Sequence, residues 1–515
     1  MKTNVAIILS LTLVSLVVVP AASAQSEEKT GTNEVPPAPV IQAEQFTSEH
    51  RITIGGRTVE YTATAGTMLM RGDEDEPIAL FGYTAYVEKD ADAATRPILF
   101  AYNGGPGSAS IWLHMGILGP QRVVVEDAEF TPPGPFRRVA NKHSILDEAD
   151  LVMIDPVGTG FSKPVGDAEG KDFWGVDQDI ASVSEFIARY VTENGRWLSP
   201  KYLLGESYGG MRSAGVAYRL LKSHDLALNG VILVSPFLDF VAGFPGVGFD
   251  LPHVLFFTTF AATAWYHEAI PDRPADLRAF LEEAERFADT VYAPALFKGN
   301  RLTEAERQEA LAGLARFTGI SEDYWDRANM RIDESRFSKE LLRDQREVSG
   351  RFDSRFKGEG LNHIAERFSY DPFASAVSPA FAAAFHDYYR KDLGVDLERD
   401  YVFSAGLWKD WDESHRSPAG PQWFKMPVAN TAIDLTYAMV QNPNMRVLVQ
   451  QGYFDLATPY GVTEYVLDHM DLVEELRENI TVKYYEAGHM MYIHLPSLKQ
   501  LKEDLSRFVL SALPQ

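Results

Sequence analysis

The sequence contains no cysteine, and this absence excludes several chemical solutions at once. Without thiols the protein has no disulfide bonds, no thiolate metal site and no cysteine nucleophile. The stability of the 515-residue chain must therefore come from a large hydrophobic core. Its content of 45% apolar and 23% charged residues is that of an ordinary globular protein. Length alone suggests two or three domains, or one domain with a large insertion.

Positive charge is also scarce, because 48 lysines and arginines face 72 aspartates and glutamates. The resulting net charge of −24 would repel a nucleic-acid backbone or an anionic membrane surface. We therefore expect no nucleic-acid partner. The simplest interpretation of the acidity is solubility, and nothing in the sequence indicates the oligomeric state.

Residues 1–24 have the pattern of a cleaved signal peptide. Lys2 precedes an apolar run over 5–19, and small residues at 22–24 form a cleavage site. The run is short for a membrane span, so we expect an exported protein, periplasmic or secreted, with no membrane contact after cleavage. A retained membrane anchor is the alternative. Residues 25–44 contain three prolines and predict a disordered, extended linker.

Strand and helix patterns alternate after the linker. Residues 51–54 and 59–64 flank Gly55-Gly56 and predict a β-hairpin, which 79–87 extends as a meander at a sheet edge. Apolar residues at helical spacing predict a helix over 176–190. Continuous apolar runs predict buried strands at 98–102, 151–154, 202–204 and 231–234. This alternation predicts an α/β fold with a mostly parallel central sheet flanked by helices.

The pattern changes after about residue 240, where helical, charge-rich sequence replaces the apolar strands. Helices are predicted at 274–292, 303–317 and 338–348, the second opening with a capping box. Strand patterns resume at 446–450 and 480–485. We therefore expect an inserted helical cap at 241–427 and a core domain in two parts, 45–240 and 428–515.

Gly205-Glu206-Ser207-Tyr208-Gly209 is the only Gly-x-Ser-x-Gly segment in the chain. A predicted strand leads into it and a segment able to form a helix follows, as a nucleophile elbow requires. The two glycines leave room for the sharp turn, which places the serine at its top. The segment therefore predicts Ser207 as a nucleophile, whose hydroxyl needs a base and a group that orients that base.

Two later loops supply candidates for those roles in the order serine, acid, histidine. Asp455 follows the predicted strand 446–450, and His489 follows 480–485. Taken alone, Asp455 is equally consistent with a turn residue and His489 with a hydrogen-bonded structural histidine. The competing candidates lie in helical or apolar sequence instead of at strand ends: Asp468, His469 and His494. Three residues in order at three strand ends favour a catalytic triad.

The loop Asn103–Ser108 contains three glycines and directly follows the predicted strand 98–102. Such a bend can aim backbone N–H groups at an oxyanion, and the N–H groups of Gly105 and Tyr208 would form a two-donor hole. A plain tight turn is the alternative. Glu206 places a carboxyl beside the nucleophile, where it would repel an anionic substrate unless one of the two acids holds a proton. A surface or capping glutamate is the alternative there.

Together these segments resemble the serine carboxypeptidase family. The matching pieces are Asn103 to Ser110, Asp155 to Ser162, Gly205 to Gly210, Gly452 to Pro459 and Gly488-His489-Met490. The resemblance implies an α/β-hydrolase fold with a helical cap and release of C-terminal residues from peptide substrates, usually best at acidic pH. It assigns Ser207, Asp455 and His489 to the triad and requires no metal or cofactor.

The resemblance further assigns the oxyanion hole to Gly105 and Tyr208, and binding of the substrate's terminal carboxylate to Asn103, Gly104 and Glu206. The chain departs from the family at Ile117, where a second carboxylate-binding glutamate is usual, and it lacks the family's cysteines, one of which Ser108 replaces. The rival hypotheses are another serine hydrolase on the same fold, namely an aminopeptidase, esterase or acyltransferase, and a non-catalytic binding protein.

Overall fold

The computed structural model describes residues 41–246, 248–421 and 423–513. The predicted signal peptide and most of the predicted linker lie outside the described residues. Within the part of the chain that is described, no helix has the length and apolar character needed to cross a membrane.

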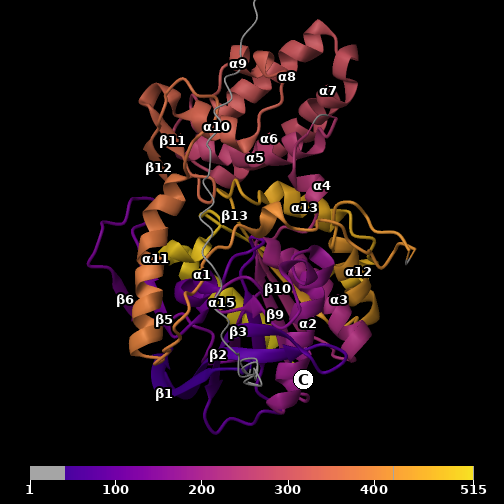
Figure 1. Ribbon diagram of the computed structural model, residues 1–515. Coiled ribbons are helices and arrows are strands. Elements are labelled where there is room, and N and C mark those ends of the chain that lie inside the picture. The colour runs from indigo at the N-terminus through magenta and orange to yellow at the C-terminus, as the bar shows by residue number, and fades with distance from the viewer. Residues whose placement is uncertain (1–40, 247, 422, 514–515) are drawn as a thin grey trace, which may run out of the picture. The chain divides into compact units, whose positions relative to one another are not determined.

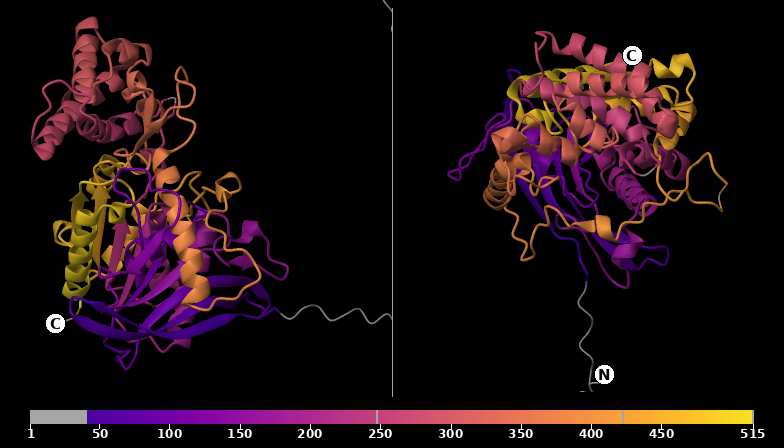
Figure 2. Two further views of the ribbon diagram at one scale, coloured as in Figure 1. Left: turned by 90° about the vertical axis from the view of Figure 1, so that its left-hand side faces the viewer. Right: turned by 90° about the horizontal axis from the view of Figure 1, so that it is seen from above.

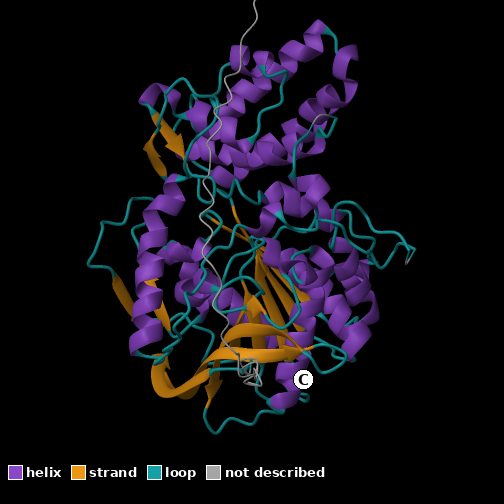
Figure 3. Cartoon of the chain, in the orientation of Figure 1, coloured by secondary structure: helices purple, strands orange, loops and turns teal. Residues whose placement is uncertain are grey.

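A ten-stranded sheet forms the centre of the molecule (Figures 1 and 3). Its main path runs β1 (Gln45–Ile54), β2 (Arg57–Arg71), β3 (Pro77–Glu88), β7 (Asp150–Asp155), β4 (Ile98–Tyr102), β9 (Lys201–Glu206), β10 (Gly230–Val234), β13 (Arg446–Gly452) and β14 (Ile480–Tyr485), and β8 (Lys163–Pro164) pairs with β3. The pairing is antiparallel from β1 to β7 and parallel from β7 to β14. The predictions of an edge meander and of a mostly parallel sheet are confirmed.

Helices cover both faces of the sheet, and the buried strands supply apolar side chains to each. On β10, Val231 and Leu233 join the core cluster under α2 (Val176–Glu193), α3 (Tyr208–His224) and α12 (Ala432–Gln441). Ile232 and Val234 point the other way, into the cluster that contains α11 (Pro372–Lys391) and α15 (Leu495–Ser511). This two-sided burial explains why the parallel strands read as continuous apolar runs.

The neighbouring strands β10 and β13 are far apart in sequence, and the residues between them form most of the remaining helices. These are α4 (Phe240–Gly243), α5 (Leu251–Tyr266), α6 (Leu277–Phe287), α7 (Ala293–Lys298), α8 (Glu304–Thr318), α9 (Glu322–Arg327) and α10 (Glu334–Leu341). Figure 2 shows α5 to α10 gathered beyond one end of the sheet, whereas α11 lies along the core. We continue to call residues 241–427 the inserted segment.

Three smaller features complete the chain. The predicted helix over 338–348 is correct only up to Leu341, where α10 ends, and Arg346 takes a left-handed φ of 61° just before a short hairpin. That hairpin is β11 (Glu347–Ser349) with β12 (Lys357–Glu359), and a second one is β5 (Gln121–Val124) with β6 (Arg137–Ala140). The short helices α1 (Ile111–Leu113), α13 (Tyr460–Asp468) and α14 (Glu474–Arg477) lie in loops that leave the sheet.

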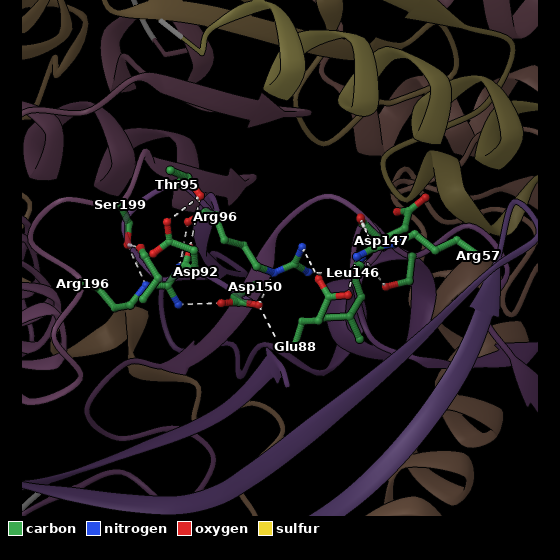
Figure 4. A network of polar contacts seen from close by, with 12 residues as sticks. Arg57, Glu88, Asp92, Thr95, Arg96, Leu146, Asp147, Asp150, Arg196 and Ser199 are labelled. Atoms are coloured by element: carbon green, nitrogen blue, oxygen red, sulfur yellow. Dashed lines mark hydrogen bonds and ion pairs between the residues drawn. The ribbon is translucent and has the colours of Figure 1, made fainter. Parts of the chain in front are cut away.

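A buried ionic network ties the amino ends of the central strands together (Figure 4). Asp150, the first residue of β7, accepts hydrogen bonds from Arg96 Nε at 2.7 Å and from Arg196 Nη1 at 2.5 Å. Arg96 stands just before β4 and Arg196 a few residues before β9. All three side chains are almost fully buried, and Glu88 pairs with Arg96 Nη1 at 2.6 Å, so two carboxylates balance the two guanidinium charges in the core.

Candidate active site

Ser207 lies at a sharp turn between β9 and α3. Its backbone has φ 63° and ψ −129°, which a non-glycine residue adopts only when its surroundings enforce it. The Ser207 N–H donates to Val234 O at 3.0 Å, and its carbonyl accepts from the N–H of Gly210 at 2.8 Å. A Cβ on Gly205 would lie 2.0 Å from the carbonyl oxygen of Gly209. A side chain at the glycines of the motif would therefore collide with neighbouring atoms. Ser207 lies at the top of a nucleophile elbow.

Asp455 and His489 meet beside the carboxyl ends of β13 and β14. Asp455 Oδ2 lies 2.7 Å from His489 Nδ1. The carboxylate also accepts the N–H groups of Ala457 at 2.8 Å and Thr458 at 3.0 Å, and the Thr458 hydroxyl lies 2.7 Å from Oδ2. Burial opposes the charge on Asp455, but His489 and these hydrogen bonds outweigh it and lower the pKa of the carboxyl. The aspartate is thus held ionised and aimed at the imidazole.

The pKa of His489 is raised, because Asp455 and, more weakly, Glu206 outweigh the burial of the ring. Its backbone is fixed as well: the N–H donates to Phe352 O at 2.6 Å, and the carbonyl accepts from Ser235 Oγ at 2.9 Å. The Nδ1 contact to Asp455 leaves Nε2 as the nitrogen that can act as a base.

Ser207 and His489 both line a cavity of about 820 Å³. Among the residues described, the serine hydroxyl makes no hydrogen bond to His489 or to any other side chain. Catalytic hydrogen bonds are often loose before substrate binds, so this geometry is compatible with a serine that is engaged only in the complex. Asp455 and His489, in contrast, are already in contact without substrate.

The competing candidates have other surroundings. His469 stacks on Tyr465 and bonds its carbonyl oxygen at 2.7 Å, and Asp468 ends α13. His494 contacts Ser497 at 2.8 Å and lies 3.8 Å from Asp127. None of the three belongs to the described residues that line the cavity.

The glycine-rich loop packs directly against the nucleophile elbow. A Cβ on Gly104 would lie 2.5 Å from the Tyr208 nitrogen, and Gly105 has a φ of 110° that favours glycine. Tyr208 is the first residue of α3, so its N–H has no acceptor within the helix. Gly105 and Tyr208 both line the cavity, where their N–H groups can serve a developing oxyanion.

Glu206 and Asn103 form a buried polar pair in the same cavity. Asn103 Nδ2 donates to Glu206 Oε1 at 2.8 Å, while Oε2 has no hydrogen-bond partner among the described residues. Burial raises the pKa of Glu206 to about 7, although the nearby His489 pulls it down. The carboxyl is therefore neutral in mildly acidic solution and able to donate a hydrogen bond.

The inserted segment supplies cavity walls that sequence patterns did not reveal. Its contributions include Arg351, Phe352, Trp408 and Trp411, and the Phe352 ring lies 5.1 Å from the His489 ring. No motif marks these residues, because their role depends on tertiary contacts alone. No group of three or more histidines and acids among the described residues is arranged to hold a metal ion.

Comparisons with known proteins identify the family of this chain. The family model described as serine carboxypeptidase matches residues 61–339. Serine carboxypeptidase-like 45 of Arabidopsis thaliana is 29% identical over 180 residues, which are 33% of this chain and 36% of that protein. The pheromone-processing carboxypeptidase KEX1 of Saccharomyces cerevisiae is 33% identical over 122 residues, 22% of this chain and 16% of that protein. These matches therefore span about a third of the relatives' length or less.

Among solved structures, the prohormone-processing carboxypeptidase KEX1(delta)p from Saccharomyces cerevisiae superposes with a TM-score of 0.52 at 14% identity, covering 88% of this chain and 92% of that one. This likeness supports the α/β-hydrolase fold. Because the family model matches more than half of the chain, the protein belongs to the serine carboxypeptidase family.

Proposed function

We propose that this protein is an exported serine carboxypeptidase that releases C-terminal amino acids from peptides, best at acidic pH. The observation that carries the proposal is the contact of 2.7 Å between Asp455 and His489, with His489 lining the same cavity as Ser207 on its elbow. The elbow, the acid–base pair and the N–H groups of the glycine-rich loop supply the parts of acyl transfer. Residues 1–24 act as the export signal, 25–44 as a linker and 241–427 as the cap.

In the proposed reaction, Ser207 Oγ attacks the last peptide carbonyl while His489 Nε2 takes its proton. The oxyanion forms against the N–H groups of Gly105 and Tyr208. His489 then gives the proton to the departing amino acid, which leaves an acyl-enzyme on Ser207. Water, deprotonated by the same imidazole, releases the shortened peptide, and Asp455 stabilises the imidazolium in both steps.

The terminal carboxylate of the substrate is assigned to Asn103, Gly104 and Glu206. Protonated Glu206 donates to that carboxylate from Oε2, the oxygen for which the described residues supply no hydrogen-bond partner. Ile117, where the family usually has a second glutamate, is 3% exposed within an apolar cluster. Terminal carboxylate binding therefore rests on a single carboxyl group here.

The proposal is tested with the purified protein and Ser207→Ala. N-blocked dipeptides with a free C-terminus are expected to be cleaved by the wild type alone, and mass spectrometry identifies the released amino acid. A fluorophosphonate probe is expected to label the wild type and not the variant. Equal cleavage of C-amidated peptides would favour an esterase or general peptidase, cleavage from a free N-terminus would favour an aminopeptidase, and no labelling would favour a binding protein.

A further inference from the structure

Arg351 contributes the only lysine or arginine side chain among the described residues that line the active-site cavity. The other ionisable residues that line this space are His489, Tyr208 and three glutamates, namely Glu206, Glu334 and Glu413. A lone guanidinium in a cavity of about 820 Å³ is a strong recognition element, because it stays charged at every pH at which the enzyme folds.

The backbone around Arg351 is fixed to the catalytic loops. The Arg351 carbonyl accepts the N–H of Leu456, next to the proposed triad aspartate, at 3.0 Å. The following residue, Phe352, accepts the N–H of His489 at 2.6 Å. On the other side, the Arg351 N–H donates to Asp371 Oδ1 at 3.2 Å. These hydrogen bonds fix the backbone of Arg351 relative to Asp455 and His489, the proposed acid and base of the triad.

The guanidinium itself is free by comparison. Within the described residues it makes no hydrogen bond, and its only ion pair is the long contact of 3.8 Å to Glu334 Oε1. It lies over the Phe352 ring, 5.3 Å from the centroid, and its side chain is 34% exposed. Arg355 in the same segment is different, because Asp353 at 2.6 Å and Asp127 at 3.1 Å both bind it. Unlike Arg355, Arg351 presents guanidinium donors to the cavity that make no hydrogen bond within the described residues.

We propose that Arg351 is a specificity-determining residue that binds the side-chain carboxylate of an aspartate or glutamate next to the scissile bond. This inference rests on the proposed carboxypeptidase function. A planar fork of N–H donors matches a carboxylate in two parallel hydrogen bonds. The terminal carboxylate is assigned to the buried Asn103–Glu206 pair, which leaves Arg351, on the Phe352 side of His489, for an acidic side chain.

The test compares kcat/KM for N-blocked dipeptides that differ only in glutamate against glutamine, placed in turn on each side of the cut. Wild type is expected to prefer the glutamate peptide at one of the two positions. Arg351→Gln should lower kcat/KM for that peptide by about 10- to 100-fold, the usual weight of a charge-assisted hydrogen bond, and change the glutamine peptide less than about threefold. Arg351→Lys should recover part of the preference, because it keeps the charge and loses the fork.

Two further variants sharpen the reading. Glu334→Gln removes the competing carboxylate and should increase the preference for glutamate. Arg316→Gln is the matched control, since Arg316 on α8 pairs with Glu283 on α6 and is absent from the cavity lining. An equal loss on both peptides in Arg351→Gln would overturn the proposal and assign Arg351 to positioning His489 or binding the terminal carboxylate.

A binding assay tests the role of Arg351 without requiring hydrolysis. The same peptides are titrated into Ser207→Ala, with and without Arg351→Gln, by calorimetry. A glutamate preference that disappears with Arg351 supports the inference even if the wild type hydrolyses neither peptide, which would refute the proposed function alone. Equal affinities for glutamate and glutamine peptides would overturn the inference.

Discussion

Replacing Glu206 by glutamine tests the most unusual electrostatic feature of the cavity. Burial raises the pKa of this carboxyl from 4.5 to about 7, a difference that favours the protonated form by about 3 kcal/mol at about 1.4 kcal/mol per pH unit. Glutamine has the shape of the protonated acid and keeps an oxygen for the Asn103 amide. The variant therefore fixes the neutral state at every pH.

The consequence for activity follows from the titration. The protonated fraction of Glu206 falls about tenfold between about pH 6 and about pH 8, so wild-type kcat/KM should fall with it. In Glu206→Gln that alkaline decline is expected to disappear. Protonated Glu206 also carries no charge that would raise the pKa of His489, so the imidazole remains available as a base at lower pH.

The free energy of unfolding should also depend on the protonation of Glu206. Because the folded-state pKa lies above the unfolded value, Glu206 favours folding below about pH 4.5, and this contribution is lost as pH rises through about 7. Urea unfolding at about pH 5.5 and about pH 8.5 should therefore show the wild type losing about 2 kcal/mol more than the variant, because part of the contribution is already lost at about pH 5.5.

Glu464→Gln is the matched control, because burial also raises the pKa of Glu464 to about 7, and this residue is absent from the cavity lining. It should leave the alkaline decline of activity in place. An unchanged decline between about pH 6 and about pH 8 in Glu206→Gln would refute the reasoning and assign the decline to another group.

Three further changes have defined outcomes. Asp455→Asn removes the charge that stabilises the His489 imidazolium, so kcat on a blocked dipeptide should fall about 10,000-fold, and a loss under tenfold would contradict a triad. Gly104→Ala places a Cβ 2.5 Å from the Tyr208 nitrogen and should lower kcat about 100-fold by displacing the oxyanion donors, with circular dichroism confirming an unchanged fold. Asp150→Asn leaves the buried Arg196 without a carboxylate partner, while Arg96 keeps Glu88, and should lower the free energy of unfolding in urea by about 3 kcal/mol; wild-type stability would show that the network is dispensable.

Much of the fold could be predicted because local pattern and tertiary role coincide. The strand β10 is apolar on both faces, and both faces are in fact covered by helices. The hairpin around Gly55-Gly56 has the turn that its glycines indicate, both with positive φ. The helix expected over 338–348 extends only to Leu341, because the chain leaves helical geometry at Leu342 and Arg346 takes a left-handed conformation, for which an arginine gives no signal.

The candidate site also contains some residues that the sequence predicts and others that it does not. Ser207, Asp455 and His489 carry signals because each follows a strand, and parallel strands end at one edge of the sheet. The structure brings Asp455 to His489, while their assigned roles remain predictions. Arg351 and Phe352 carry no such signal, since a residue in the inserted segment reaches the cavity only through long-range packing.

The hydrogen bond from the His489 N–H to Phe352 O has a practical consequence for redesign of this protein. Deleting the inserted segment to obtain a smaller protein would remove the acceptor of the His489 N–H from the loop that carries this proposed general base. Replacing the inserted segment with one from another protein would do the same, unless the new segment supplied a carbonyl oxygen at the position of Phe352 O. One stretch of main chain therefore affects both substrate range and catalytic activity. Libraries that vary the inserted segment should keep Arg351–Ser354 unchanged.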